Sequence, residues 1–264
     1  MSTTPVSLIM HGAAGRMGRR ILHLASEDAA AFRIAGGVDR DSGSLADLGI
    51  PCDAPLWTEL PAMPGSVVVD FSHASITEAV ILRCQEVGMP LAIGTTGVDP
   101  ETLNPLLERA AQDIPVLWAP NMSVGVNVVI ATARRLALTL GDDYDIEIVE
   151  AHHHHKVDAP SGTALGIADA IAEATGRSRA DYQHGRSGHC GARKAREIGM
   201  HALRMGDVVG DHTVYFVGGG ERITLGHVAH NRDIFAGGAL RAARFLAQAQ
   251  AGRYSMADVL GLGD

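Results

Sequence analysis

Short, uniformly apolar runs alternate with amphipathic segments through the first half of the chain. The apolar runs cover residues 6–11, 33–39, 67–72, 90–97 and 114–121. Strands that are apolar on both faces and separated by helices are typical of a parallel sheet covered on both sides. The pattern therefore predicts an α/β fold with a Rossmann-like, doubly wound parallel sheet.

The second half has a different order of elements. A long helical segment over residues 124–140 leads into a strand-like run at 145–152, and a further helix over 163–175 ends at Gly176. Three β-like runs then follow one another closely, which favours a second α+β domain with an open mixed sheet. The tail predicts a helix that returns to the first domain. The predicted division is a dinucleotide-binding domain, 1–122 and 233–264, and a substrate-binding and oligomerisation domain, 123–232.

Composition and charge narrow the possible partners. The chain has 264 residues, 46% of them hydrophobic, and a formal net charge of -8. Nucleic acid or an anionic membrane would need a broad positive face, so neither is expected as a partner. No apolar run approaches the roughly 18 residues of a membrane span, and the N-terminus lacks a basic signal region. The expected location is the cytoplasm, with Cys52, Cys84 and Cys190 as reduced thiols used in packing.

A glycine-rich turn, GAAGRMG, follows the first predicted strand and contains Gly12, Gly15 and Gly18. Such a turn lets a pyrophosphate approach the backbone at a helix N-terminus, where free amides and the helix dipole favour negative charge. Ala14 replaces the second glycine of the GxGxxG pattern, and a tight structural turn is the alternative. Asp39, at the end of the second strand, stands where the ribose-binding acid is required, so the context predicts dinucleotide binding.

The residues beside this loop leave the type of dinucleotide open. Asp39 would accept the 2′-hydroxyl of NADH, whereas Arg40 could pair with the 2′-phosphate of NADPH. Two later strand ends, 94–97 and 119–125, place small and polar residues at the carboxyl edge of the sheet and could line the nicotinamide half. Ordinary turn chemistry is the alternative for both.

The stretch AHHHHKVDAPSGTAL, residues 151–165, contains four consecutive histidines. Successive side chains of a strand point to opposite faces, so at most a pair such as His152 and His154 could converge on one ion, with Glu150 and Asp158 nearby. Lys156 would oppose a cation there. We therefore expect no metal, although a polar loop with exposed histidines remains an alternative.

The residues after the histidines form a possible anion site. Ser161 and Gly162 stand at the N-terminus of the helix predicted to start at Thr163, so backbone amides and two hydroxyls could bind an anion. Lys156 adds a mobile charge and a proton donor, and histidine titrates near neutrality. A dinucleotide domain joined to such a site indicates hydride transfer to a small acidic molecule.

Several segments together resemble the 4-hydroxy-tetrahydrodipicolinate reductase family, also called dihydrodipicolinate reductase. The segments are GAAGRMG, DFS, GTTG, APNMSVGVN, EAHHHHKVDAPSGTAL and GDVVGDHTVYF. The resemblance implies that NADH or NADPH reduces a cyclic dicarboxylate imine, with loss of water, to tetrahydrodipicolinate in the diaminopimelate route to lysine. It also implies a homotetramer held by the sheets of the second domain.

By position, the resemblance implies roles for individual residues. His152 would be the acid/base and Lys156 the proton donor. Substrate carboxylates would be bound by His153, Gly162, Thr163 and Arg232. The cofactor would be bound by Gly12, Ala13, Ala14, Gly15, Arg16, Met17, Asp39, Arg40, Gly94, Thr95, Thr96, Ala119, Pro120, Asn121 and Met122. His154 falls at a variable position of the motif and is assigned no role.

Two other classes of protein remain as alternatives. A metal-dependent hydrolase or lyase would use the histidines as ligands, and chelation would abolish its activity. A dinucleotide-sensing regulator would bind NADH without turnover, and the acidic composition argues against contact with DNA.

Overall fold

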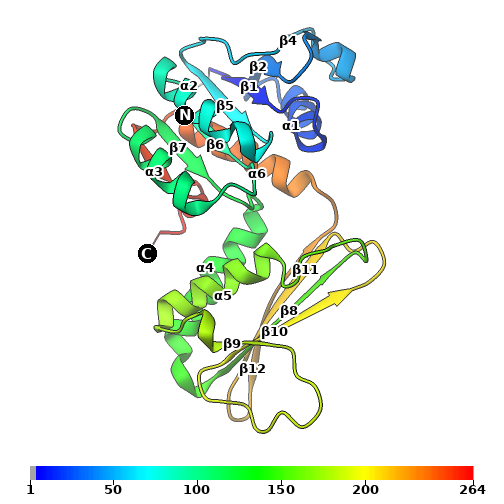
Figure 1. Ribbon diagram of the computed structural model, residues 1–264, viewed down its shortest axis with the longest axis vertical. Helices are drawn as coiled ribbons and strands as arrows, with labels where there is room; N and C mark the ends of the chain where they lie inside the picture. The colour runs from blue at the N-terminus through cyan, green and yellow to red at the C-terminus, as the bar shows by residue number, and fades with distance from the viewer. Residues whose placement is uncertain (1–3, 264) are drawn as a thin grey trace. The chain divides into compact units, whose positions relative to one another are not determined.

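The computed structural model describes residues 4–263 and divides the chain into two compact units (Figure 1). Unit 1 contains the described residues up to Val124 and those from Asp233 onward, and unit 2 spans Gly125–Arg232. Residues 1–3 and 264, which the predicted first domain includes, lie outside the described residues.

Unit 1 is built on an eight-stranded sheet in the order β13-β7-β6-β5-β1-β2-β4-β3. All neighbouring strands are parallel except the short pair β3 and β4. The strands are β1 (Val6–His11), β2 (Phe32–Val38), β3 (Gly43–Ser44), β4 (Pro55–Trp57), β5 (Ser66–Asp70), β6 (Leu91–Ile93), β7 (Pro115–Trp118) and β13 (Gly252–Tyr254). The α/β fold with a parallel, Rossmann-like sheet is therefore confirmed.

Helices cover both faces of this sheet, and each face has its own apolar core. The helices are α1 (Arg16–Glu27), α2 (Thr77–Val87), α3 (Pro100–Ala110), α6 (Asp233–Leu246) and α7 (Met256–Leu260), with 3-10 turns at Leu45–Leu48 (η1) and Ala74–Ile76 (η2). One core packs α1, α6 and α7 on the sheet, with Leu8 and Met10 of β1 at its centre. The other packs α2 and α3 around Ile9 and Val68. Successive residues Leu8, Ile9 and Met10 of β1 are all apolar because they enter the two cores in alternation.

Unit 2 contains a five-stranded mixed sheet in the order β12-β11-β8-β10-β9. β8 lies at the centre, pairing parallel with β10 and antiparallel with β11. The strands are β8 (Asp145–His152), β9 (Tyr182–His184), β10 (Ile198–Arg204), β11 (Gly210–Val217) and β12 (Arg222–Ala229). This arrangement confirms the predicted second, mixed sheet.

Two long helices, α4 (Val124–Leu140) and α5 (Gly162–Thr175), cover one face of this sheet (Figure 1). Short 3-10 turns lie at Gly141–Asp143 (η3) and Arg179–Asp181 (η4). Even-numbered side chains of β8 and β11, such as Ile148 and Phe216, enter the core beneath the helices. Odd-numbered side chains of β8, β10 and β11 therefore face the other side.

Helix α4 bears on the expectation that no apolar run approaches the length of a membrane span. Val124–Asp143, which is α4 with the turn after it, is long and apolar enough to cross a membrane by length and composition. Arg134 and Arg135 break any continuous apolar run, but the average over the segment is still apolar. A core helix passes the same test, and Val129 and Ala133 belong to the buried cluster beneath α4.

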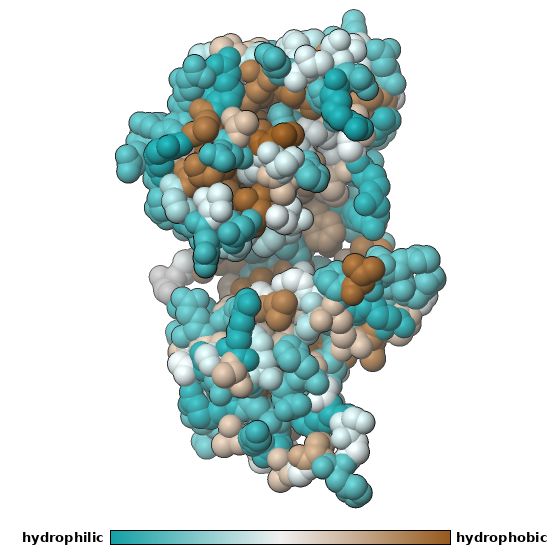
Figure 2. Space-filling model, viewed as in Figure 1, coloured by the Kyte–Doolittle hydropathy of each residue, from teal (hydrophilic) through white to brown (hydrophobic). Residues whose placement is uncertain are grey.

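Smaller differences between the predicted and the observed elements occur where the local sequence pattern is weak. β6 ends at Ile93, so residues 94–97 form a loop rather than the end of a strand. The short strands β3, β4, β9 and β13 carry too few residues to show a period. Cys84 is buried as expected of a packing residue, whereas Cys190 is exposed. The surface visible in Figure 2 is mainly hydrophilic, with apolar side chains in small groups.

Candidate active site

The glycine loop connects β1 to α1 in unit 1. Gly12 has φ 83°, and a Cβ there would lie 2.6 Å from the carbonyl oxygen of Phe71. A Cβ at Gly18 would lie 2.1 Å from the carbonyl oxygen of Gly12. Helix α1 begins after Gly15 without a side-chain cap or an acidic residue in its first turn. The loop is therefore a close-packed cradle of backbone that opens at a helix N-terminus, which suits a pyrophosphate.

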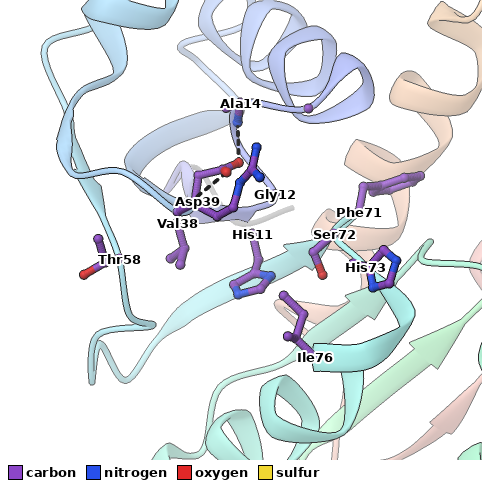
Figure 3. A pocket seen from close by; sticks show the side chains of 12 residues that line it. His11, Gly12, Ala14, Val38, Asp39, Thr58, Phe71, Ser72, His73 and Ile76 are labelled. Carbon is purple, nitrogen blue, oxygen red and sulfur yellow. Dashed lines mark hydrogen bonds between the residues drawn. The ribbon is translucent and has the colours of Figure 1, made fainter.

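Asp39 folds back onto this loop from the end of β2. Its Oδ2 accepts a hydrogen bond from the amide of Ala14 at 2.8 Å, and its Oδ1 accepts one from the amide of Arg40 at 2.9 Å (Figure 3). Beside it lies a cavity of about 400 Å³ that is also lined by Gly12, Gly15 and Arg40. Asp39 thus stands at the rim of a cavity that could hold a ribose and a base.

The same cavity includes residues that the sequence did not single out. They are His11, Val38, Thr58, Phe71, Ser72, His73 and Ile76. Figure 3 shows the His11 ring between Val38 and Ile76, with His73 farther along toward Phe71. These residues come from the ends of β1, β2, β4 and β5, which is the edge of a doubly wound sheet where ligands bind.

A second cavity of about 610 Å³ shares Phe71, Ser72 and His73 with the first. Its remaining lining is Arg16, Met17, Ala74, Gly94, Thr95, Thr96 and Gly97. A Cβ at Gly94 would lie 2.2 Å from the Phe71 ring, so glycine is required for this packing. The structure therefore brings the predicted loop 94–96 next to the glycine loop.

The other predicted cofactor residues are placed differently. The side chains of Ala13, Ala119 and Met122 are 0%, 7% and 1% exposed and belong to the core of unit 1. None of these three residues lines either of the two cavities. Pro120 is exposed, and the Asn121 side chain accepts a hydrogen bond from the amide of Ser123 at 2.9 Å.

A buried carboxylate, Asp70 at the end of β5, connects the two cavities. It is 0% exposed and lies 2.8 Å from Nδ1 of His11. The hydroxyl of Ser72 donates to it at 2.5 Å, and that of Thr95 donates at 2.6 Å. Oγ1 of Thr95 also accepts the amide of Ser72 at 2.9 Å. We call Asp70, His11, Ser72 and Thr95 the Asp70 cluster.

A second buried carboxylate lies at the end of β8 in unit 2. Oε2 of Glu150 is 2.7 Å from Nδ1 of His152, and Oε1 accepts the amide of Ser161 at 3.0 Å. Arg204 donates to both oxygens, at 2.8 and 2.9 Å. We call Glu150, His152, Ser161, Arg204 and the adjoining His212 the Glu150 cluster.

Opposing effects set the pKa of Glu150. Burial alone would raise this pKa, but hydrogen bonds from Arg204, His152 and the Ser161 amide outweigh burial and lower it. Glu150 is therefore ionised at neutral pH.

The loop from His153 to Pro160 carries the predicted substrate residue His153 and the predicted proton donor Lys156. Lys156 forms an ion pair with Asp158 at 2.8 Å, and this contact lowers the pKa of Asp158. Burial lowers the pKa of His153, and the positive charges of His155 and Arg232 lower it further. The charge of Arg232 therefore acts on His153, the other residue predicted to bind the same carboxylate.

The turn that was predicted to bind an anion lies at the N-terminus of α5. The Ser161 hydroxyl accepts the amide of Ala164 at 3.1 Å and caps α5. Gly162 is exposed at the first position of the helix, and Thr163 is half-buried beside it.

The four histidines are unequal, and only His152 belongs to the strand. Strand alternation therefore does not apply to the other three, which lie in a turn. His154 donates from Nδ1 to the carbonyl oxygen of Gly206 at 2.8 Å, and its ring lies tilted by 51° against that of His155, with centroids 3.9 Å apart. Within residues 4–263, no three His, Cys, Asp or Glu side chains are placed to hold a metal ion. Glu150 and Asp158 are instead paired with Arg204 and Lys156.

The parallel sheet with its glycine loop is typical of a dinucleotide-dependent oxidoreductase, and the second sheet carries a cluster of buried ionisable side chains. Two family models match almost the whole chain. "Dihydrodipicolinate reductase, N-terminus" matches residues 6–122, and "Dihydrodipicolinate reductase, C-terminus" matches residues 125–260. The chain belongs to the dihydrodipicolinate reductase family.

Curated relatives and a solved structure agree with this assignment. The 4-hydroxy-tetrahydrodipicolinate reductase of Myxococcus xanthus is 47% identical, with 97% of this chain and 98% of the relative covered. That of Nitrosospira multiformis is 45% identical, with 99% of each chain covered. A dipicolinate-bound dihydrodipicolinate reductase from Paenisporosarcina sp. TG-14 has the same fold, with a TM-score of 0.74 at 23% identity over 96% of this chain and 98% of the other.

Proposed function

We propose that the chain reduces 4-hydroxy-tetrahydrodipicolinate to tetrahydrodipicolinate, with loss of water, in lysine biosynthesis by the diaminopimelate pathway. The family match over nearly the whole chain carries this proposal. The geometry of the two units supports it, since each holds one of the two kinds of site that the reaction needs. The reaction would take place in the cytoplasm.

NADH or NADPH, when bound, supplies the hydride. The residues proposed to hold it are Gly12, Ala13, Ala14, Gly15, Arg16, Met17, Asp39, Arg40, Gly94, Thr95, Thr96, Ala119, Pro120, Asn121 and Met122. The cradle at Gly12 and Gly18 and the two cavities beside it fit a dinucleotide. Asp39 already accepts two backbone amides, which fixes its carboxylate toward the cavity rim. Arg40 stands next to it for a 2′-phosphate, so both cofactors are proposed to bind.

The substrate is proposed to bind in unit 2 through its two carboxylates. Gly162 and Thr163 at the N-terminus of α5 would bind one carboxylate, and His153 with Arg232 would bind the other. Charge-assisted hydrogen bonds are each worth roughly 1.5–3 kcal/mol, so a few of them suffice in an otherwise acidic protein. A substrate carboxylate would also compete with Asp158 for the ammonium of Lys156. Binding of the substrate thus brings Lys156 to the reacting ring.

His152 and Lys156 are proposed to move the protons of the reaction. Loss of the 4-hydroxyl as water leaves a conjugated imine, and hydride then adds at C4. A proton from Lys156 or His152 neutralises the negative charge that develops on the ring. Orientation of the substrate by the carboxylate contacts is the main contribution of the protein, because the dinucleotide supplies the redox chemistry.

One assay tests this function. The substrate is generated enzymatically from pyruvate and aspartate semialdehyde, and the absorbance of NADH and NADPH is followed separately. We expect substrate-dependent oxidation of the dinucleotide, undiminished by a chelator, with tetrahydrodipicolinate identified by mass spectrometry. Binding of NADH without turnover would instead indicate a regulator, and loss of activity with a chelator would indicate a metal enzyme.

A homotetramer is proposed from the open face of the second sheet. Leu203, Val217 and Val228 are 46%, 38% and 56% exposed and alternate onto the face that α4 and α5 leave uncovered. Exposed apolar side chains on a sheet face favour contact with another copy. Light scattering should report four chains of 27.7 kDa, and a monomer mass would contradict the proposal.

A further inference from the structure

Glu150 and His152 lie two residues apart on β8, so both side chains point to the same side of the strand. They are 1% and 9% exposed. A carboxylate accepts hydrogen bonds only, so the contact of 2.7 Å between Oε2 and Nδ1 requires the proton to be on Nδ1. The imidazole then presents Nε2 as its reactive nitrogen.

Arg204 holds the Glu150 carboxylate in its contact with His152. The arginine comes from the end of β10, where it stands opposite His152 in the parallel register. Its two nitrogens bind the two carboxylate oxygens at 2.8 and 2.9 Å, which is the bidentate geometry of a strong ion pair. The carboxylate therefore stays ionised and fixed in its plane while His152 gains or loses a proton.

His212 closes the other side of the His152 ring. It stands opposite Glu150 in the antiparallel register of β11, and the two imidazoles meet edge to face with centroids 5.1 Å apart. Burial and the neighbouring His152 lower the pKa of His212 to about 4, so it is neutral at physiological pH. A Cβ at Gly210 would lie 3.0 Å from Nε2 of His152, so the glycine leaves this edge of the ring open.

We propose that Glu150, held by Arg204, is a positioning residue of the reaction that fixes His152 as the Nδ1-protonated tautomer with Nε2 directed at the substrate. This inference rests on the proposed function of His152. A purely structural role, in which Glu150 only ties β8 to β10, is the competing interpretation.

Glu147 offers a matched control on the same strand. It lies on the opposite face of β8 and has the same kinds of partner, with Nε2 of His201 at 2.7 Å and Arg186 and Arg193 on its oxygens. Hydrogen bonds from Arg186 and His201 outweigh burial and lower the pKa of Glu147 to about 2. Glu147→Gln thus removes a comparable ion-pair network without touching His152.

The experiment compares Glu150→Gln, Glu150→Asp and Glu147→Gln with the unaltered protein, using kcat, KM and thermal stability. We expect Glu150→Gln to lower kcat by about 100-fold, with little change in the KM for NADPH. Glu150→Asp, which keeps the charge, should restore part of the loss. Glu147→Gln should keep kcat within about twofold, whatever its cost in stability.

The pH profile of kcat separates positioning from structure. The charged or titratable groups around His152 are Glu150, His153, Lys156, Arg204 and His212. Only Glu150 among these is changed in Glu150→Gln. The profile should differ from that of the unaltered protein in Glu150→Gln and match it in Glu147→Gln, because only the first change removes the charge that contacts His152. An unchanged profile with kcat near that of the unaltered protein would overturn the proposal.

Nitrogen NMR of ¹⁵N-histidine-labelled protein provides a test that does not depend on turnover. The His152 signals, identified by their absence in His152→Asn, should show a protonated Nδ1 and an unprotonated Nε2 in the neutral ring. The opposite tautomer would refute the positioning role. If the substrate assay fails but this tautomer is found, the proposed function is wrong while the role of Glu150 in orienting His152 stands.

Discussion

The Asp70 cluster of unit 1 and the Glu150 cluster of unit 2 share a buried carboxylate–histidine pair but differ in the other partners of the carboxylate. Each has a carboxylate that is at most 1% exposed, at the carboxyl end of a central strand, and each carboxylate meets Nδ1 of a histidine at 2.7 or 2.8 Å. Asp70 is completed by the hydroxyls of Ser72 and Thr95, whereas Glu150 is completed by the guanidinium of Arg204.

This difference in partners corresponds to a difference in use. The hydroxyls on Asp70 come from residues that line the two cofactor cavities, so the Asp70 cluster sets the positions of loops. Arg204 keeps Glu150 charged, so His152 can change its protonation state without leaving the carboxylate unpaired. We therefore interpret the carboxylate–histidine pair of unit 1 as a positional element and propose that the pair of unit 2 transfers protons.

The largest expected effect concerns Lys156 beside the Glu150 cluster. Replacing Lys156 by Ala should lower kcat by about 10²- to 10⁴-fold, because a proton donor and a carboxylate contact are lost together. The dissociation constant for NADPH, measured by fluorescence titration, should stay nearly unchanged, since the cofactor loops belong to unit 1. Lys156→Arg serves as the control that keeps the charge without an easily released proton, and turnover near that of the unaltered protein in Lys156→Ala would contradict the role.

The low pKa of His212 in the Glu150 cluster predicts that the stability of the protein depends on pH. In the unfolded chain His212 takes up a proton near its ordinary pKa of 6.5, whereas in the folded chain it does so at about 4. As pH falls from 6.5 to 4 the unfolded state gains the proton first, so the free energy of unfolding drops by up to about 3 kcal/mol. Urea unfolding at several pH values should show a smaller drop for His212→Asn, and equal drops would refute this linkage.

Asp70→Asn should have a smaller effect of another kind. The asparagine side chain has one oxygen that accepts hydrogen bonds, whereas its nitrogen only donates. It therefore cannot accept from His11, Ser72 and Thr95 as the two carboxylate oxygens do, and one buried donor loses its acceptor at a cost of about 2 kcal/mol. We expect unfolding to have its midpoint at a lower urea concentration and the KM for the cofactor to be higher. The pH profile of kcat should not change. If that profile shifted as it should in Glu150→Gln, the distinction between the two clusters would fail.

The smallest expected effect tests the choice of dinucleotide. Arg40→Ala should weaken NADPH binding by about tenfold, the size of one charge-assisted contact at an exposed site, and leave NADH binding within about twofold. Separate titrations with the two cofactors measure this. Equal weakening of both would show that Arg40 does not contact the 2′-phosphate.

Local patterns were sufficient to predict most of the fold. β1, β8 and α4 have the bounds expected from the sequence, because each is a long run with an unbroken period. Gly176 ends α5 in the left-handed conformation, with φ 64°, as a helix stop should. The short strands β4 and β13 were missed because three residues cannot display a period.

The candidate site was predictable only where its residues are close in sequence. His152, Lys156 and the turn at Ser161 share one motif, and the alternation of β8 could have placed Glu150 on the same face as His152. Arg204 and His212 reach the cluster only through the registers of β10 and β11 against β8. That strand order depends on tertiary packing, which one sequence does not specify.

The most direct test of the account compares the two histidines of the two clusters. His152→Asn and His11→Asn each keep a donor for the neighbouring carboxylate and remove a titratable ring. In single-turnover experiments with bound NADPH, we expect hydride transfer in His152→Asn to be slower by about 100-fold or more, and in His11→Asn to stay within about threefold of the unaltered protein. Equal rates in the two variants, or a greater loss in His11→Asn, would contradict the assignment of proton transfer to the Glu150 cluster.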